Sequence, residues 1–400
     1  MLPDSKIFDR MQRKICYYLG VFEKEITDLA KRELLRSILS RASAAGPVIT
    51  IQGRTYVNFA FNDYLGLANH PEVIRAAGAA LQNYGFGSGA SRLLAGGTVL
   101  HDRLERHIAG FKQTEAARLF NCGYAANTGV IPSLSAEGDI IYSDALNHAS
   151  IIDGCRLSRA QTVIYRHGDV SHLEQLMKQR CRGRRIVVSD TVFSMDGDIA
   201  PLPDLYSLCR RNAALLYLDD AHGTGVLGKG KGALAHFNIR PEPWIVQMGT
   251  FSKACGSFGA FVAGSRVLID WISNTARSLL FSTTLPAAEA AASMAALRII
   301  RKTPSLVTRL WLIRNRVAGD LKSLGYETMG SETPIIPVRA ASVHDAVRLS
   351  RFLFEGGVYA PAIRPPTVRE ARIRITVSAA HEDRHVEKLL LRLRKWRQGR

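Results

Sequence analysis

The sequence predicts an α/β protein with two domains, a large one built on a mainly parallel β-sheet and a smaller C-terminal α+β domain. In the middle of the chain, short apolar runs rich in β-branched residues alternate with helical patterns, which is typical of parallel strands covered by helices. After about residue 290 this alternation gives way to a long helical pattern followed by short strands. A chain of 400 residues is long enough to bury a core in both domains.

The N-terminal part predicts a helix over residues 5–44, ended by a turn at residues 45–47. Apolar residues recur there at near-helical spacing, namely Leu29, Leu34, Leu35, Ile38 and Leu39. We expect residues 1–60 to form a helical arm with small strands. The first 20 residues lack the apolar stretch and cleavage site of a secretory signal, so a cytoplasmic protein is expected.

The alternating region, residues 61–290, is expected to form the large domain. Its clearest predicted strands lie at residues 185–189, 215–218 and 244–248, and its clearest helix at residues 101–111. Residues 291–400 are expected to form the small domain. The pattern predicts a helical stretch over residues 287–324, strands at 334–338 and 372–377, and a helix near 343–356.

Composition narrows the classes of function. The net charge of +18 would attract nucleic acid, an acidic carrier protein or a small polyanionic substrate. Aromatic residues do not interleave with the dense basic group at residues 178–185, so a stacking platform for single strands is not indicated. No apolar run is long enough to span a membrane. The six cysteines include no C-x-x-C pair, so we expect no zinc site or other bound metal.

Two glycine-rich segments match nucleotide-binding loops in part. Residues 223–229 fit the first seven positions of a phosphate-binding P-loop, but Gly230 stands where a Ser or Thr is required. Residues 85–92 have the wrong spacing for a dinucleotide-binding loop and follow a predicted helix. We therefore reject both segments as loops of these two kinds.

Three predicted strands end in polar residues that a parallel sheet would bring to one rim, where open α/β sheets bind ligands. One strand ends in Asp219, with His222 three residues later; the second runs into Thr250 and Lys253, and the third leads to Ser194. Pyridoxal phosphate (PLP) needs these groups: a lysine to form an imine, and an acid beside the pyridine nitrogen. It also needs a donor at the phenolic oxygen, and hydroxyl or backbone N–H groups around the phosphate.

Longer segments around these residues resemble those of α-oxoamine synthases. Members of that family condense an amino acid with an acyl-CoA and release CO2, on the fold-type I framework of PLP-dependent aminotransferases. The resemblance runs from about residue 35 to 385. The matching segments are residues 62–67, 87–92, 147–150, 192–197, 219–225 and 249–253.

The resemblance implies roles at the ring of the cofactor. Lys253 would bind PLP covalently and act as the base at Cα, and Asp219 would pair with the pyridinium nitrogen. His222 would contact the phenolic oxygen, while His148 would stack on the ring face beside the substrate. Asp220 is expected to point to the opposite face of the sheet from Asp219, because side chains alternate along a strand.

The resemblance also implies the groups around the phosphate and the substrates. Ser194 would lie near the phenolic side, while Thr250 and the backbone of Gly123 and Tyr124 would hold the phosphate. Residues 359–381 resemble the branch that joins L-alanine to a pimeloyl thioester in biotin synthesis.

In that branch Arg374 would bind the alanine carboxylate, with Asn62 assisting, because a guanidinium fork suits a carboxylate. Thr367 and Arg36 would face the acyl substrate, whose carrier, CoA or acyl carrier protein, stays open. A homodimer with an active site at the subunit interface is implied as well. Two alternatives remain. One is a sibling specificity, glycine with acetyl-CoA or serine with a long acyl-CoA, and the other is a basic nucleic-acid-binding protein on a transferase fold.

Overall fold

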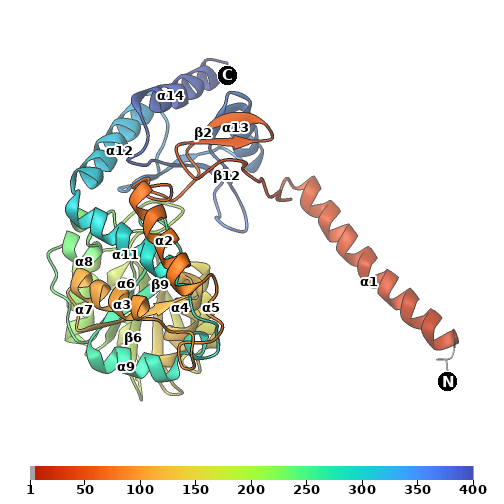
Figure 1. The fold of residues 1–400 in the computed structure, drawn as a ribbon. Helices are drawn as coiled ribbons and strands as arrows, with labels where there is room; N and C mark the ends of the chain where they lie inside the picture. The colour runs from red at the N-terminus through yellow and green to blue at the C-terminus, as the bar shows by residue number, and fades with distance from the viewer. Residues whose placement is uncertain (1–4, 400) are drawn as a thin grey trace.

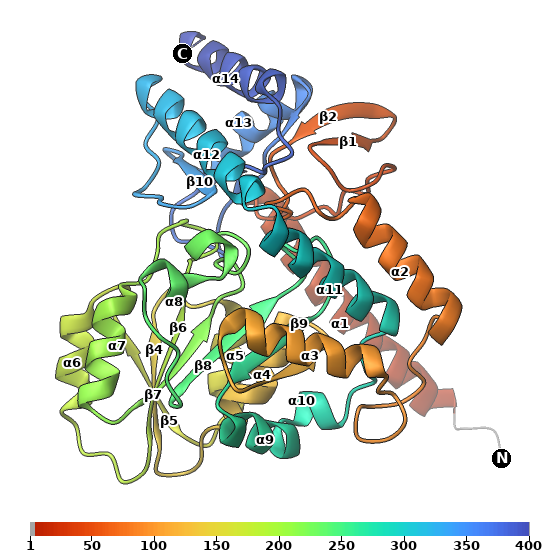
Figure 2. The same cartoon turned by 60° about the vertical axis from the view of Figure 1, so that its left-hand side comes forward.

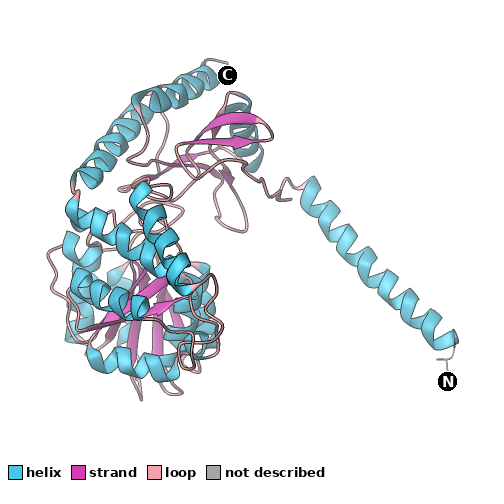
Figure 3. Cartoon of the chain, in the orientation of Figure 1, coloured by secondary structure: helices cyan, strands magenta, loops and turns pink. Residues whose placement is uncertain are grey.

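The computed structural model describes the backbone of residues 5–399 and the side chains of residues 14–399. Residues 1–4 and 400, at the ends of the predicted terminal units, lie outside the described residues. The chain folds into a larger lobe around a sheet and a smaller lobe of C-terminal helices and short strands (Figure 1, Figure 3). Helix α1 (Ser5–Lys31) extends away from both lobes in Figure 1.

A seven-stranded sheet forms the centre of the larger lobe, in the order β3-β9-β8-β7-β6-β4-β5. Strand β9 is antiparallel to both of its neighbours, and the other neighbouring pairs are parallel. The strands are β3 (Ala116–Phe120), β4 (Ile140–Asp144), β5 (Gln161–Tyr165), β6 (Arg185–Asp190), β7 (Leu215–Asp219), β8 (Ile245–Thr250) and β9 (Ala260–Gly264). The predicted α/β class is confirmed, and β6, β7 and β8 lie within two residues of the three predicted strands.

Helices cover both faces of this sheet, as Figure 2 shows, and this explains why its central strands are mostly apolar. Along β7, Leu216 and Leu218 pack into one core cluster, while Tyr217 between them packs into another. The first cluster takes residues from α2 (Pro71–Tyr84), α3 (Val99–Lys112), α6 (Val170–Met177), α7 (Leu202–Arg211) and α11 (Ala287–Lys302). The second takes residues from α4 (Gly123–Ser133), α5 (Ala149–Leu157), α9 (Arg266–Thr275) and α10 (Arg277–Leu280).

The smaller lobe contains two three-stranded sheets. In one, β2 (Arg54–Asn58) pairs with both β1 (Val48–Ile51) and β11 (Val358–Tyr359). In the other, β13 (Arg372–Thr376) lies between β10 (Ile335–Arg339) and β12 (Ala362–Ile363). Its helices are α12 (Ser305–Ser323), α13 (Val343–Glu355) and α14 (Asp383–Gln398). The β2–β11 pairing joins the N-terminal β-hairpin to the C-terminal part of the chain. The predicted domain boundaries near residues 60 and 290 stay a prediction.

Two helix predictions are wrong in extent. The N-terminal helix ends at Lys31, because Glu33 adopts a left-handed conformation (φ 55°) and the amides of Leu34 and Leu35 fold back onto the Leu29 carbonyl. The stretch over residues 287–324 is two helices, α11 and α12. Pro304 separates them, because a proline lacks the amide N–H and disfavours helical geometry in the preceding residue.

Three further features of the described residues bear on function. No helix among them is both long and apolar enough to cross a bilayer. No group of three or more His, Cys, Asp or Glu side chains among them is arranged to hold a metal ion. All six cysteines are free thiols, and only Cys155, Cys209 and Cys255 are buried.

Candidate functional site

Strands β6, β7 and β8 place polar residues side by side at their carboxyl ends. In the register of the sheet, Asp190 lies opposite Asp219, and Asp219 lies opposite Met248, two residues before Thr250. Asp190 and Asp219 are both buried. Burial raises the pKa of Asp190 well above its usual range, and the negative charge of Asp219 raises it further. The rim therefore holds two buried carboxyl groups side by side, and this arrangement raises the pKa of Asp190.

Lys253 lies in the turn that follows β8 and is partly buried. Burial lowers the pKa of its ammonium group; the charges of Asp219 and Asp190 raise the pKa, and that of Arg374 lowers it. The turn is compact, since the Lys253 carbonyl accepts a hydrogen bond from the Gly256 amide. Gly256 has φ 59°, and a Cβ there would lie 2.1 Å from the Ala68 amide nitrogen. Residues far apart in the sequence thus lie around a lysine whose pKa is lowered by burial.

Asp219 is held by the helix that begins at the same rim. Nδ2 of Asn127, in α4, donates to the Asp219 carboxylate at 2.8 Å, and the Ala221 amide donates to its other oxygen at 3.0 Å. The Tyr217 hydroxyl in turn donates to Oδ1 of Asn127 at 2.7 Å. These bonds fix the orientation of the carboxylate before any ligand binds. The sequence analysis missed Asn127, and the signal for it is a single amide side chain among the small and apolar residues of α4.

His222 is buried and its Nδ1 lies 2.6 Å from the Tyr64 hydroxyl. Burial lowers the pKa of His222 well below its usual value, and the positive charges of Lys253 and Arg374 lower it further. Burial also raises the pKa of Tyr64 to about 12. Both side chains are therefore neutral near pH 7 and can share one proton between them. Tyr64 was missed as a site residue, although it lies within the matching segment at residues 62–67.

His148 caps the start of α5 beside the rim. Its amide donates to the Asp190 carboxylate at 2.6 Å, and its Nδ1 lies 2.7 Å from the Ser150 hydroxyl. Burial lowers the pKa of His148, the charge of Asp219 raises it, and that of Lys253 lowers it. The predicted set of Lys253, Asp219 and His148 is thus electrostatically coupled.

The N-terminus of α4 provides a place for an anion. The first intrahelical bond of α4 runs from the Ala126 amide to the Cys122 carbonyl, so the amides of Gly123 and Tyr124 precede the helical ladder. The Tyr124 side chain is exposed and its hydroxyl donates to Asp153. The Thr250 hydroxyl lies between the Gly259 carbonyl and the Ser252 hydroxyl, 2.8 Å from each.

Arg374 brings a buried guanidinium group to this cluster from β13 of the smaller lobe. Nε donates to the Ser194 carbonyl at 2.7 Å, Nη1 to the Thr376 hydroxyl at 2.7 Å, and Nη2 to Oδ1 of Asn62 at 3.1 Å. Its side chain is 5% exposed, and burial lowers its pKa. No carboxylate of the described residues forms an ion pair with it. A buried cation without an acidic partner is costly, so this position suits a carboxylate ligand.

Comparisons with known proteins fit this geometry. The family described as aminotransferase class I and II matches residues 54–393. The chain is 46% identical over 370 residues to an 8-amino-7-oxononanoate synthase of Geobacter sulfurreducens, covering 91% of this chain and 94% of the relative. This chain belongs to the α-oxoamine synthase family.

Solved structures show the same relationship. A serine palmitoyltransferase from S. paucimobilis with a bound PLP–myriocin aldimine is 27% identical, with a TM-score of 0.90 over 96% of this chain and 98% of that one. An 8-amino-7-oxononanoate synthase from Francisella tularensis is 26% identical, with a TM-score of 0.76 over 86% of this chain and 98% of that one. The fold-type I framework predicted for an α-oxoamine synthase is thereby confirmed.

Two residues of the α-oxoamine synthase that were predicted to face the acyl substrate do meet each other. Nη2 of Arg36 donates to the Thr367 hydroxyl at 2.6 Å, although the two residues are 331 positions apart. Arg364 stabilises this contact, because its guanidinium group donates to the carbonyls of Glu33 and Leu35 at 2.6 and 2.8 Å. No hydrogen bond among the described residues links Arg36 or Thr367 to the Lys253 cluster.

Asp220 points to the other face of the sheet from Asp219, as expected from the strand period. Its carboxylate accepts a hydrogen bond from the fully buried Lys112 ammonium at 2.6 Å, and others from the hydroxyls of Thr191 and Thr224 at 2.8 and 2.9 Å. Neighbouring aspartates therefore serve different purposes: Asp219 faces the ligand rim, and Asp220 anchors the loop that follows it.

Proposed function

We propose that this α-oxoamine synthase is a PLP-dependent acyltransferase of biotin synthesis. It would condense L-alanine with a pimeloyl thioester, carried on CoA or acyl carrier protein, to give 8-amino-7-oxononanoate and CO2. The observation that carries the proposal is the buried guanidinium group of Arg374, which has no acidic partner among the described residues and interacts electrostatically with Lys253. The names of relatives such as the Geobacter sulfurreducens enzyme support the choice of substrates.

The residues at the rim fit PLP. The free amides of Gly123 and Tyr124, together with the Thr250 hydroxyl, suit its phosphate. Asp219 suits the pyridine nitrogen, because a buried carboxylate held by Asn127 would keep that nitrogen protonated. When bound, PLP supplies an electron sink that stabilises negative charge at Cα of the amino acid.

The remaining ring contacts come from His148, His222 and Ser194. His148 would contact the ring of the cofactor and the substrate. His222, neutral and paired with Tyr64, is positioned to donate to the phenolic oxygen from Nε2. Ser194 would lie near the phenolic side, and the bond from Arg374 to its carbonyl supports this role.

Lys253 and Arg374 would act on different groups of the amino acid: Lys253 on the Cα proton and Arg374 on the carboxylate. With its lowered pKa, Lys253 spends part of its time as a free amine, which is the form that covalently binds the cofactor and removes the Cα proton. Arg374 and Asn62 would hold the alanine carboxylate. A C–C bond then forms between alanine Cα and the thioester carbonyl carbon, the C–S bond breaks, and the thiol leaves. The carboxylate departs as CO2, and Lys253 returns a proton to Cα.

Arg36 and Thr367 would receive the pimeloyl chain. Their mutual hydrogen bond places a cation and a hydroxyl together at an exposed position, where the distal carboxylate of pimelate would find a charge-assisted donor. This assignment can be tested separately from the chemistry at Lys253. Substitution of Arg36 or Thr367 should change the selectivity among acyl donors and should not abolish catalysis.

We further propose a homodimer. The loop after α2 and the segment before α11 meet through a bridge between Ser91 and Thr283. Large apolar side chains project into solvent from these two segments, namely Phe86 (82% exposed), Leu93 (71%), Leu94 (78%) and Phe281 (73%). A cluster of this kind marks a protein–protein interface, and a twofold axis is the commonest way to cover it. Sedimentation of an active monomer would contradict this assembly.

The decisive experiment measures release of free thiol by purified, PLP-loaded protein. Pimeloyl-CoA with L-alanine should release thiol, and 8-amino-7-oxononanoate should accumulate. The high TM-score to a serine palmitoyltransferase makes serine with palmitoyl-CoA the second candidate, and glycine with acetyl-CoA is the third. Thiol release with either of these pairs, but not with alanine and pimeloyl-CoA, would replace the proposed substrates. A colourless protein that shifts DNA would favour the nucleic-acid-binding alternative.

A further inference from the structure

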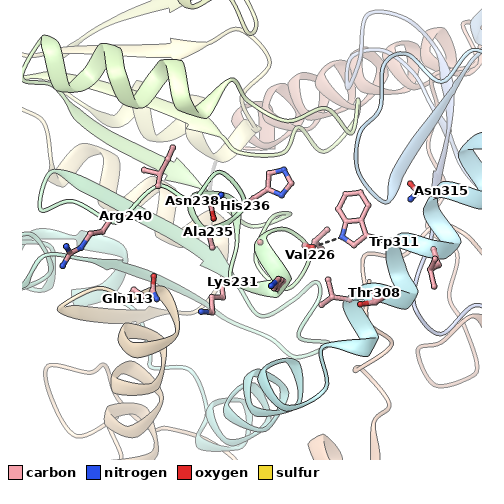
Figure 4. A pocket seen from close by; sticks show the side chains of 15 residues that line it. Gln113, Val226, Lys231, Ala235, His236, Asn238, Arg240, Thr308, Trp311 and Asn315 are labelled. Carbon is pink, nitrogen blue, oxygen red and sulfur yellow. Dashed lines mark hydrogen bonds between the residues drawn. The ribbon is translucent and has the colours of Figure 1, made fainter.

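A cleft of about 940 Å³ lies between α12 and the segment spanning residues 226–240, which contains the short helices η1 (Gly228–Gly230) and α8 (Ala233–His236). None of the residues that line it belongs to the site around Lys253. Its size is in the range of pockets that bind small molecules, about 300–1,000 Å³. In Figure 4, Thr308 and Trp311 of α12 lie on one side and His236 and Lys231 of the other segment lie on the other, with Arg240 farther from α12.

The wall that α12 provides contains an aromatic ring and combines the apolar residues Val307, Trp311 and Leu312 with the polar residues Thr308 and Asn315. Val307, Trp311 and Asn315 follow one another at four-residue spacing, so they share one face of α12. The indole N–H of Trp311 donates to the Val226 carbonyl at 3.1 Å, as Figure 4 shows. This bond holds the ring in place as part of the wall, and a fixed aromatic surface favours a flat, apolar ligand group.

The opposite wall is cationic. Lys229, Lys231, His236 and Arg240 all line the cleft from the 226–240 segment, and no Asp or Glu is among the lining residues. Within the part of the chain that the structure describes, none of these four side chains forms an ion pair. The two lysines and Arg240 are exposed, so their charges are available to a ligand. Several unpaired cations around one concave surface attract a polyanion.

We propose that this cleft binds a nucleoside polyphosphate. The base would lie against Trp311, and the phosphates would be neutralised by Lys229, Lys231 and Arg240. This class of ligand combines a planar ring with several negative charges, and so matches both walls at once. The mode of binding differs from a P-loop, because the cations here are side chains of a loop and not a cradle of amides before a long helix.

The cleft shares a loop with the cofactor rim. The backbone oxygen of Lys231 accepts a hydrogen bond from Lys112 at 2.9 Å, and the same ammonium group is the partner of Asp220. The Asp220 carboxylate also accepts a hydrogen bond from the Ala233 amide at 3.1 Å. The loop that carries the cations is therefore anchored to the residue next to Asp219.

The test is calorimetric titration of ADP into PLP-loaded protein. Inorganic pyrophosphate and adenosine, which represent the phosphate half and the nucleoside half of ADP, are titrated separately. ADP should bind more tightly than either half. The double substitution Lys231→Glu/Arg240→Glu should raise the Kd for ADP by about tenfold or more. Trp311→Leu should weaken ADP and adenosine but not pyrophosphate, and Trp311→Phe, which keeps a ring, should retain most of the ADP affinity.

Lys322→Glu is the matched control, because Lys322 is an exposed lysine of α12 that does not line the cleft. It should leave the Kd for ADP unchanged. Absence of ADP binding, or binding that the cleft substitutions do not weaken, would overturn the proposal. Pyrophosphate binding as tightly as ADP would do the same, because the aromatic wall would then contribute nothing. The cleft lies outside the proposed catalytic residues, so failure here leaves the thiol-release experiment unaffected.

Discussion

The Tyr64 hydroxyl lies 2.6 Å from Nδ1 of His222, with both side chains buried beside Lys253 and Arg374. Tyr64 precedes β3 by more than fifty residues, whereas His222 follows β7, so only the folded chain brings them together. If the hydroxyl donates to Nδ1, the proton of the neutral imidazole resides on Nε2, the nitrogen that is free to meet a ligand.

Tyr64→Phe should therefore lower kcat with little loss of PLP, because His222 would lose the partner that fixes its tautomer. We expect a decrease of roughly tenfold, the effect of one lost hydrogen bond of about 1–1.5 kcal/mol. The visible absorption band of the bound cofactor should shift, since His222 contacts the phenolic oxygen in the proposed site. An unchanged spectrum and an unchanged kcat would remove Tyr64 from the site.

Lys253→Ala should abolish thiol release and the visible band of the covalently bound cofactor. The circular dichroism spectrum should remain that of the wild type, because the Lys253 side chain forms no hydrogen bond with any other residue that the structure describes. Lys322→Ala, at an exposed lysine of α12, is the control and should behave as the wild type. Turnover of the Lys253→Ala protein at the wild-type rate would remove the central claim about this site.

The adjacent aspartates should respond differently to the same change. Asp219→Asn should bind PLP, fold normally and lose most activity, because the pyridine nitrogen loses its anionic partner. Asp220→Asn should instead destabilise the fold by up to about 3–5 kcal/mol, since the buried Lys112 ammonium loses its counter-charge. Thermal unfolding and kcat, measured on both variants, distinguish the two effects.

A compensating pair of substitutions sharpens this comparison. Lys112→Met combined with Asp220→Asn removes both charges and should recover much of the lost stability. Loss of activity in a fully folded Asp220→Asn protein, with Asp219→Asn remaining active, would show that the two carboxylates have been assigned to the wrong faces.

Arg374→Ala should weaken alanine binding by about ten- to a hundredfold, the cost of losing a charge-assisted hydrogen bond of about 1.5–3 kcal/mol. The Kd for alanine is measured by adding alanine to the PLP-loaded protein and following the change in visible absorption. PLP affinity should barely change, because Arg374 lies on the substrate side. The alanine affinity of Arg374→Lys should lie between those of the wild type and Arg374→Ala, because lysine retains the positive charge but not the planar guanidinium group. Equal alanine affinity in all three proteins would contradict the role.

His167 should make stability depend on pH. Its ring nitrogens lie 2.9 Å from the carboxylates of Asp144 and Asp198. Burial lowers its pKa, but the hydrogen bonds to these carboxylates outweigh burial and raise the pKa to about 10. Because the unfolded value is about 6.5, the stabilisation is complete below that pH and is lost as pH rises towards 10.

Thermal melts of the wild type should therefore decline between about pH 6.5 and 10 more steeply than those of His167→Gln. The exposed His236 provides the control, and His236→Gln should keep the wild-type slope. Parallel pH profiles for the wild type and His167→Gln would show that His167 is not charged in the folded protein.

The residue pattern by itself determined the α/β class and the identity of the groups at the rim. Strands buried on both faces must be apolar along their whole length, so β6, β7 and β8 were recognisable, and polar residues at their ends stood out. The period of two along a strand also separated Asp219 from Asp220. These are local properties, and they need no knowledge of distant parts of the chain.

The end of the N-terminal helix and the supporting contacts of the site were decided by the tertiary structure, whereas the break between α11 and α12 is marked in the sequence by Pro304. The leucines after Lys31 have helical spacing, yet the carbonyls of Glu33 and Leu35 accept hydrogen bonds from Arg364, more than 300 positions away, and the segment is not helical. Asn127 and Tyr64 support the site only because α4 and the segment before α2 pack against the strand ends. Contacts of this kind depend on which elements meet in space, and neither spacing nor composition along the sequence records that.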